Sequence, residues 1–334
     1  MVNYYVRRTA RVFVTIFGVM SLTFGLIRLL PGGPFTQLRT QLLRQGIPPE
    51  QVNQQIENLQ NVRPDAGLGE QYVNYMISAF QLDLGTSIQY SRPVTEMVAQ
   101  AAPWTIFIVV VSTILMFIVG ILLGAIQAYW EGSRFDTIAS SMSIVGMSIP
   151  FYVAAILLLL FMSYRWGLFP ASGTANPNID NQWSLDYAIS VVMHGALPIL
   201  SYTIVGIGGQ ALAMRGNSIQ VLGEDFVEVA RLRGLSDGRI ATRYVARNAI
   251  LPMYTGFLLL LGFRLGGTVI LEQIFNYPGL GLYLLDAVNS NDYPMMMGTF
   301  LVITVALVIG VYVADLTYSM IDPRISSGDS SEAY

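Results

Sequence analysis

The stretch that decides the fold is Glu224–Pro252, EDFVEVARLRGLSDGRIATRYVARNAILP, a polar segment between two apolar runs long enough to cross a bilayer. It concentrates arginine in an otherwise apolar chain, at Arg231, Arg233, Arg239, Arg243 and Arg247. Helical patterning runs through most of the segment. A charged and structured connection between membrane-length runs predicts a surface that docks a partner protein.

Local signals divide this stretch into two helices. Acidic Glu224 and Asp225 open the first helix and arginines close it, an order of charges that complements the helix macrodipole. Gly234 is placed to end that helix in a left-handed conformation. Ser236 is placed to cap a second helix, which we expect to stop at Pro252. The apolar side of the first helix is expected to comprise Phe226, Val229, Ala230 and Leu232.

Composition indicates a membrane protein. The 334 residues are 53% hydrophobic and 12% charged, whereas about a quarter of the residues in a soluble domain are charged. The chain has no cysteine, which excludes disulfides and thiolate chemistry. It also has no lysine, so it cannot contain the GxxxxGK[ST] loop that binds ATP phosphates. If the protein uses ATP, a partner must hydrolyse it.

The apolar runs predict an all-α polytopic membrane protein with six transmembrane helices. We expect the spans at 12–27, 104–129, 137–164, 197–214, 253–271 and 299–320. Residues 1–30 then hold the first helix, 31–103 a helical extracytoplasmic cap or a loosely ordered loop, 104–325 the remaining five spans and 326–334 a tail. Pro150 should kink the third span.

The distribution of arginine orients these spans. Basic residues favour the cytoplasmic side, and the rule counts mainly for short connections. With the N-terminus inside, the cytoplasmic side carries Arg7, Arg8, Arg11, Arg134, Arg215, the five arginines of the 224–252 stretch and Arg324. Most of the arginines on the other side lie in the long 31–103 segment. The sequence therefore predicts that both termini are cytoplasmic.

The sequence motifs of the 224–252 stretch resemble a known loop. Glu228-Val229-Ala230, followed by Gly234 and then Ile250-Leu251-Pro252, is similar to the EAA loop of permease subunits in binding-protein-dependent ABC importers. The gap between Gly234 and Leu251-Pro252 is longer than in the general EAA pattern. In this it resembles the dipeptide/oligopeptide branch of the family, and the chain is most similar to the B-type permease of that branch. Val229 stands where that family usually has alanine. Further motifs similar to those of this branch are Leu30-Pro31-Gly32, Asp83–Ser87, Arg92-Pro93-Val94, Phe169–Gly173, Glu272–Phe275, Pro278–Gly281 and Asp322-Pro323-Arg324.

The resemblance implies a transport subunit of a prokaryotic cell membrane that is not itself an enzyme and holds no cofactor. Its partners would be a second homologous permease, two ATP-binding subunits, an external substrate-binding protein and the lipid bilayer, with no nucleic acid. The residues implied to couple to the ATPase are Glu228, Val229, Ala230, Arg231, Arg233, Gly234, Leu235 and Ser236. Alternating access would move di- or oligopeptides; relatives in the same branch move nickel chelates, glutathione or oligosaccharides.

A different class is a self-contained channel or secondary transporter. Such proteins carry internal repeats or paired charges along several spans, and neither is evident in this sequence. A membrane enzyme is a third class, but the spans contain no histidine pair, cysteine or carboxylate dyad.

Few polar groups mark a transport path. Arg264 lies inside the predicted fifth span, and an intramembrane arginine almost always faces protein or a wet cavity. It either borders the path and attracts a peptide carboxylate, or pairs with an acid of this chain or of a second permease. Ser148, Met147 and Gly266 are the other candidates for the path. His194 is the single histidine, and without acidic or thiol neighbours it predicts no metal site.

Overall fold

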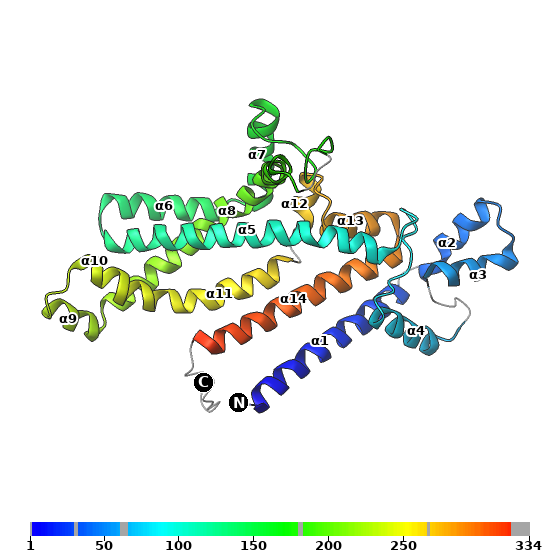
Figure 1. Cartoon of the computed structure of the whole chain (residues 1–334), viewed down its shortest axis with the longest axis horizontal. Helices are drawn as coiled ribbons and strands as arrows, with labels where there is room; N and C mark the ends of the chain where they lie inside the picture. The colour runs from blue at the N-terminus through cyan, green and yellow to red at the C-terminus, as the bar shows by residue number, and fades with distance from the viewer. Residues whose placement is uncertain (1, 30–32, 61–65, 180–182, 266–267, 322–334) are drawn as a thin grey trace. The chain divides into compact units, whose positions relative to one another are not determined.

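The computed structural model describes residues 2–29, 33–60, 66–179, 183–265 and 268–321. Within these ranges the chain is helical and contains no strand (Figure 1). A single isolated β-bridge pairs Thr86 with Pro93. The all-α class is therefore confirmed.

The helices form two compact units. The order of elements is α1 (Val2–Leu29), α2 (Gly33–Arg44), α3 (Pro49–Gln60), α4 (Leu68–Phe80), α5 (Val94–Tyr129), α6 (Arg134–Ser148), α7 (Phe151–Leu158), η1 (Leu159–Arg165), α8 (Leu185–Leu222), α9 (Asp225–Leu232), α10 (Asp237–Ile240), η2 (Ala241–Ala246), α11 (Arg247–Leu265), α12 (Val269–Ile274), α13 (Leu280–Ser290) and α14 (Tyr293–Ile321). The first unit comprises Met1–Ile106, Leu265–Gln273 and Pro278–Tyr334, and the second Phe107–Arg264 and Ile274–Tyr277.

In the first unit, α1 and α14 lie side by side (Figure 1). The hydroxyls of Thr9 and Tyr312 are 2.9 Å apart across this pair. Met20 of α1 and Leu301 of α14 are buried together with Met76 of α4. α4, the last helix before α5, is thus packed against two of the long apolar helices.

The first part of the 31–103 segment, for which we expected helices or a loose loop, consists of two helices. α2 and α3 form a hairpin that turns at Gly46, whose φ of +84° favours glycine. The hairpin has its own small core of buried side chains, Leu38, Leu42, Val52 and Ile56. Residues 33–60 therefore form ordered helices and not a loose loop.

A buried carboxylate organises the segment between α4 and α5. Asp292, in the turn between α13 and α14, accepts hydrogen bonds from the Ser87 hydroxyl and from the amides of Gln89 (3.1 Å) and Met295 (3.2 Å). This network explains why the serine of Asp83–Ser87 is buried. Nearby, burial and then a hydrogen bond to Asp286 raise the pKa of Tyr90 to about 12.

The second unit is organised on α8, a helix of 38 residues. Glycines let its neighbours approach closely: a Cβ on Gly208 would collide with the Ser143 carbonyl of α6. A Cβ on Gly124 of α5 would collide with the Ala211 carbonyl of α8. Small residues at such crossings are typical of helices that pack in membranes.

The described residues contain four helices long and apolar enough to cross a membrane, or five spans if one bent pair is counted as a single crossing. The four are Arg8–Ile27, Val94–Tyr129, Leu185–Leu222 and Tyr293–Val313, and the bent pair is Arg134–Ser148 with Phe151–Arg165. The predicted fifth span, 253–271, overlaps α11, which is not among them. Its 19 residues include Arg247 and Arg264.

The predicted third span, 137–164, contains a full break at Pro150 rather than a kink within one continuous helix. Two helices replace it, bent by 92° at the break between Ser148 and Phe151. Ile149 has an extended backbone (φ −81°, ψ 123°) because the ring of Pro150 disfavours the helical conformation of the preceding residue.

Other prolines do not end helices where we expected. α5 begins at Val94, ten residues before the predicted start of the second span at 104, and runs through Pro103. α8 begins 12 residues before the predicted Leu197 and contains Pro198. The second helix of the 224–252 stretch was expected to stop at Pro252, which instead lies inside α11. One proline removes one backbone hydrogen bond, which neighbouring helices can offset.

Two adjacent glycines of α8 test the packing of α6 on α8. We expect Gly208→Ala to destabilise the protein by about 1–3 kcal/mol, the usual effect of overpacking, because the added methyl group meets the Ser143 backbone. Gly209 has open space around its Cα, so Gly209→Ala should leave stability unchanged or raise it by up to about 1 kcal/mol. Thermal unfolding of the detergent-solubilised protein measures both. Equal melting temperatures for the two variants would contradict the close contact.

Candidate functional site

Helix α9 has the bounds that the sequence predicts. Glu224 precedes it with an extended backbone, and its carbonyl accepts a hydrogen bond from the Val227 amide at 2.9 Å. Asp225 lies in the first turn and Arg231 in the last. Gly234 has a φ of +73°, which confirms the left-handed end.

The end of α9 is a Schellman motif. The amide of Gly234 donates to the Arg231 carbonyl at 2.9 Å, and the amide of Leu235 donates to the Ala230 carbonyl at 3.3 Å. These two bonds satisfy carbonyls that a helix otherwise leaves free at its C-terminus. The side chain of Leu235 also packs against the cluster that contains Ala230, the apolar contact that commonly accompanies this motif.

The two sides of α9 differ from the prediction. Val227 and Ala230 are buried, whereas Phe226, Val229 and Leu232 are exposed by 40%, 46% and 81%. Of the four residues predicted for the apolar side, only Ala230 faces the core, and Val227 was missed. Residues 227 and 230 share one face of a helix with 3.6 residues per turn. The three other apolar side chains therefore form a second, solvent-exposed apolar face.

The buried face of α9 is held by the segment that follows it. Ile240 and Val245 are buried against Val227 and Ala230. Ser236 immediately precedes α10, as predicted, but its hydroxyl makes no capping hydrogen bond. Its carbonyl instead accepts from the amides of Arg239 (2.9 Å) and Ile240 (3.0 Å). The buried face of α9 thus packs against α10 and η2, and η2 continues directly into α11.

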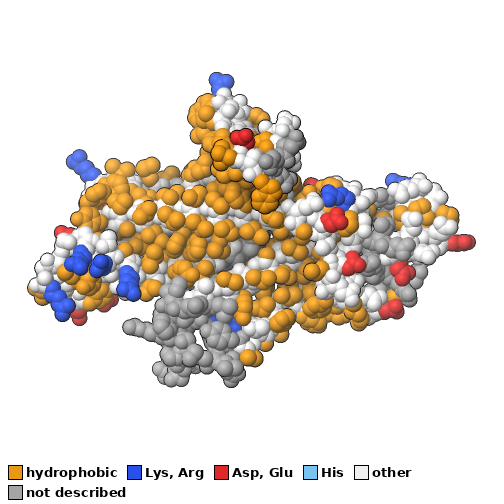
Figure 2. Space-filling model, viewed as in Figure 1, with side chains coloured by type: hydrophobic (Ala, Val, Ile, Leu, Met, Phe, Trp, Pro, Cys, Tyr) orange, Lys and Arg blue, Asp and Glu red, His pale blue; other side chains and the backbone are white. Residues whose placement is uncertain are grey.

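Charged groups surround this apolar face. Glu228, Arg231 and Arg233 are all exposed, and Figure 2 shows arginine side chains gathered over α9 and α10. A pocket of about 580 Å³ lies behind α9, and Arg231 lines it together with Trp130 and Glu131. Arg231 therefore faces a pocket within the second unit. Arg233 is the C-cap residue of α9.

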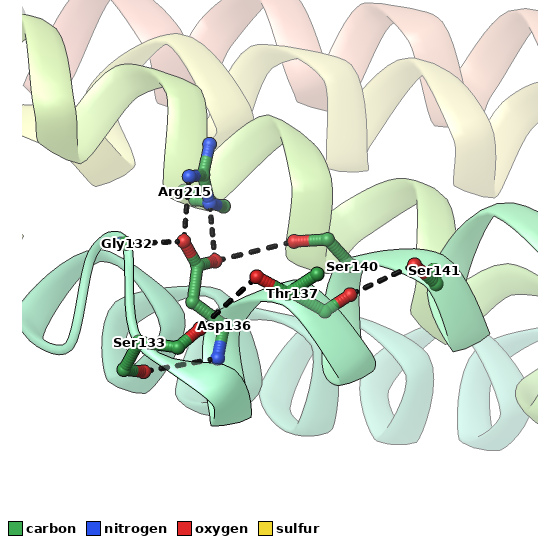
Figure 3. A network of polar contacts seen from close by, with 7 residues as sticks. All are labelled: Gly132, Ser133, Asp136, Thr137, Ser140, Ser141 and Arg215. Carbon is green, nitrogen blue, oxygen red and sulfur yellow. Dashed lines mark hydrogen bonds and ion pairs between the residues drawn. The ribbon is translucent and has the colours of Figure 1, made fainter.

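An ion pair that sequence reasoning missed fixes α6 to α8 (Figure 3). Nε and Nη2 of Arg215 lie 2.6 and 2.8 Å from the two carboxylate oxygens of Asp136. Asp136 also accepts from the Gly132 amide (3.0 Å) and the Ser140 hydroxyl (3.2 Å). Its amide donates to the Ser133 hydroxyl, which caps α6. A bidentate pair of this kind is directional, and it lies on the helix that leads into α9.

Arg264 lies near the end of α11, where its contacts include uncharged groups of three residues. Its guanidinium carbon is 4.8 Å from the centre of the Tyr202 ring. Nη2 is 3.2 Å from the Met116 sulfur, and Nη1 is 3.5 Å from the Thr113 hydroxyl. Among the described residues no carboxylate forms an ion pair with it. An internal acid partner is thus absent from this part of the chain, while the predicted role in the path stays a prediction.

The other predicted path residues are not brought together with Arg264. The Ser148 hydroxyl donates to the Ile144 carbonyl of its own helix at 2.7 Å. Met147 has an exposed side chain, and Gly266 lies outside the described residues. His194 places Nδ1 2.7 Å from the Ser190 carbonyl. The described residues hold no cluster of acidic or histidine side chains that could bind a metal ion.

The buried carboxylate of Glu272 explains why the Pro278–Gly281 motif contains a glycine at position 279. Glu272 accepts from the Thr105 hydroxyl (2.8 Å) and the Leu282 amide (2.9 Å). A Cβ on Gly279 would lie 2.5 Å from the carboxyl carbon of Glu272. The glycine therefore permits the turn between α12 and α13 to close over the carboxylate. This contact gives the turn a structural role.

The sequence matches a family model described as "Binding-protein-dependent transport system inner membrane component" over residues 120–327. This range includes α9, the pair Asp136–Arg215 and two of the four long apolar helices, α8 and α14. The chain belongs to this family, and it is a multi-pass membrane component of a transport system.

Relatives of known name cover nearly the whole chain. The chain is 30% identical to the oligopeptide transport system permease protein AppB of Bacillus subtilis (strain 168), over 97% of this chain and 99% of the relative. It is 31% identical to the dipeptide transport system permease protein DppB of Escherichia coli (strain K12), with the same coverage. The glutathione transport system permease protein GsiC of Pectobacterium atrosepticum is 29% identical over equal shares.

Removing the acid of the Asp136–Arg215 pair tests its role. We expect Asp136→Ala to lower the free energy of unfolding by about 2 kcal/mol, less than the ~3–5 kcal/mol of a fully buried pair, because the Arg215 side chain is 27% exposed. Denaturation of the wild type, both single variants and the Asp136→Ala/Arg215→Ala double variant gives the coupling energy. Ser141→Ala on the same helix, which loses only a bond to Thr137, is the control. Additive effects of the two substitutions would contradict the pair.

Proposed function

We propose that the chain is the permease subunit of an ATP-driven importer and forms part of the path by which di- or oligopeptides cross the membrane. In this proposal the chain has six spans, both termini are cytoplasmic and residues 31–103 lie outside. The observation that carries it is the exposed apolar face of α9, formed by Phe226, Val229 and Leu232. An exposed apolar face on an anchored helix is typical of a protein interface.

The partner that covers this face is an ATP-binding subunit. Membership of a binding-protein-dependent family implies such a subunit and a substrate-binding protein. The absence of lysine agrees, because this chain cannot supply the phosphate-binding loop. We propose a complex with a second homologous permease and two ATP-binding subunits. Glu228, Arg233 and the left-handed Gly234 then flank the docked face, and no cofactor is required in this chain.

Motion of the partner reaches the membrane helices through packed contacts. The buried side of α9 is fixed to η2, which continues into α11. The side-chain Nδ2 of Asn217 on α8 donates to the Ala249 carbonyl of α11 at 3.1 Å. A displacement of α9 therefore moves α8 and α11 together. Nucleotide shifts the complex between inward- and outward-open states only if it binds one state more tightly.

The cargo is proposed from the relatives and from Arg264. Two of the relatives are named for dipeptide or oligopeptide transport, and a peptide carries a terminal carboxylate. The guanidinium of Arg264 rests on the Tyr202 ring. A cation without an ion-pair partner among the described residues attracts such a carboxylate. Glutathione, nickel chelates or oligosaccharides are the alternative cargo, and the ligand bound by the partner binding protein distinguishes them.

A charge on the exposed face of α9 tests the docking. We expect Leu232→Glu to abolish co-purification of the ATP-binding subunits and to reduce uptake at least tenfold, because a carboxylate would be buried in an apolar interface. Leu232→Met keeps the apolar volume and should retain both. The side chain is 81% exposed in this chain, so neither change should affect folding. If the Glu variant retains the ATP-binding subunits, this face is not the docking site. Uptake without those subunits would indicate a self-contained channel.

Neutralising Arg264 tests the path. We expect Arg264→Gln to reduce peptide uptake at least tenfold, because the cationic charge that attracts a carboxylate is lost. Arg264→Lys retains the charge and should keep part of the activity. Uptake into proteoliposomes, with assembly checked by co-purification, measures the effect. Normal uptake by a normally assembled Gln variant would refute a role in the path.

A further inference from the structure

Helix α4 differs from the two other helices of the 31–103 segment in what it exposes. On α3 the exposed side chains include Glu50, Gln51, Gln54 and Gln55. The α2–α3 hairpin buries Leu38, Leu42, Val52 and Ile56 in its own core, and Leu43 is exposed by 44%. α4 instead exposes Val73, Ile77 and Phe80 by 52%, 50% and 66%. The two surfaces therefore suit different surroundings.

The exposed apolar residues of α4 lie on one side of the helix. Positions 73, 77 and 80 follow the i, i+4, i+7 spacing of a single helical face. Leu82, the second residue after α4, is exposed by 68% and extends the stripe. Glu70 is the only charged side chain of α4, and it lies in the first turn. A stripe of this size is costly in water.

The opposite face of α4 is packed against the last third of α1. The hydroxyls of Tyr72 and Ser21 are 2.6 Å apart. The Phe24 ring stacks on Tyr75, with the ring centres 5.6 Å apart. The apolar run of α1 ends at Ile27, so Ser21 lies about 9 Å below the end of the span at a rise of about 1.5 Å per residue. α4 therefore lies at the depth of the membrane boundary and not beyond it.

We propose that α4 is an interfacial helix that inserts the face formed by Val73, Ile77, Phe80 and Leu82 into the lipid at the end of α1. The depth agrees with the 5–10 Å by which amphipathic helices enter the boundary between headgroups and acyl chains. The apolar surface is also continuous with the span, because Leu22 and Leu26 of α1 are exposed at the same level. Tyr72 and Tyr75 are of the type enriched at membrane boundaries.

The absence of cysteine makes the proposal directly testable. Single variants Val73→Cys and Ile77→Cys are labelled with monobromobimane and reconstituted, in the assembled transporter, into phosphatidylcholine nanodiscs. Lipid carrying a doxyl spin label at acyl carbon 5 should quench both labels at least twofold, and more than lipid labelled at carbon 12. Iodide in the buffer should have little effect. Gln54→Cys on α3 is the matched control and should show the reverse.

Two outcomes would overturn the proposal. Quenching of the α4 labels by iodide to the same degree as the Gln54 label would place this face in water. Protection from both iodide and spin-labelled lipid would mean that another protein subunit covers it. Phe80→Cys provides a third position on the same face if either of the first two variants assembles poorly.

Discussion

The burial of Val227 and Ala230 against Ile240 and Val245 is the contact on which the candidate site depends. A helix of eight residues is too short to be stable alone, because the first turn costs more than it gains. Burying a valine side chain contributes about 1.5–3 kcal/mol, and the Schellman bonds at Gly234 add directional constraint. Tertiary packing therefore forms α9, and that packing leaves its other apolar face to the solvent.

Local chemistry was sufficient to predict where α9 begins and ends. Acids at one end, arginines at the other and a glycine in the left-handed position act within one or two turns, and they need no knowledge of the rest of the chain. The buried side of α9 depends on Ile240 and Val245, which come from later in the sequence. The pair Asp136–Arg215 joins residues 79 positions apart. No periodicity signals such a partner, although an acid in a turn predicted to be cytoplasmic and an arginine at the predicted end of a span were compatible with it.

The prolines show how one residue type gives opposite results. Pro103, Pro198 and Pro252 are inside helices, and each follows an alanine or a leucine. Pro150 ends α6 and follows Ile149. A β-branched side chain already disfavours the helix, and the proline ring disfavours it again at the same residue. The number of spans was harder to predict from hydropathy alone for this reason, since the apolar run continues across the break.

The break at Ile149 leaves two helices that α8 holds in different ways. α6 is held to α8 by the Asp136–Arg215 pair and by the contact at Gly208, whereas α7 packs against α8 with apolar side chains, and its Ala155 is fully buried. The first residue of the other arm, Phe151, lies against the Tyr202 ring with the ring centres 4.9 Å apart, and Arg264 rests on that same ring. A displacement of α7 along α8 would therefore change the aromatic surface against which the Arg264 guanidinium lies, so the packing of one short helix and the position of one charge are mechanically linked.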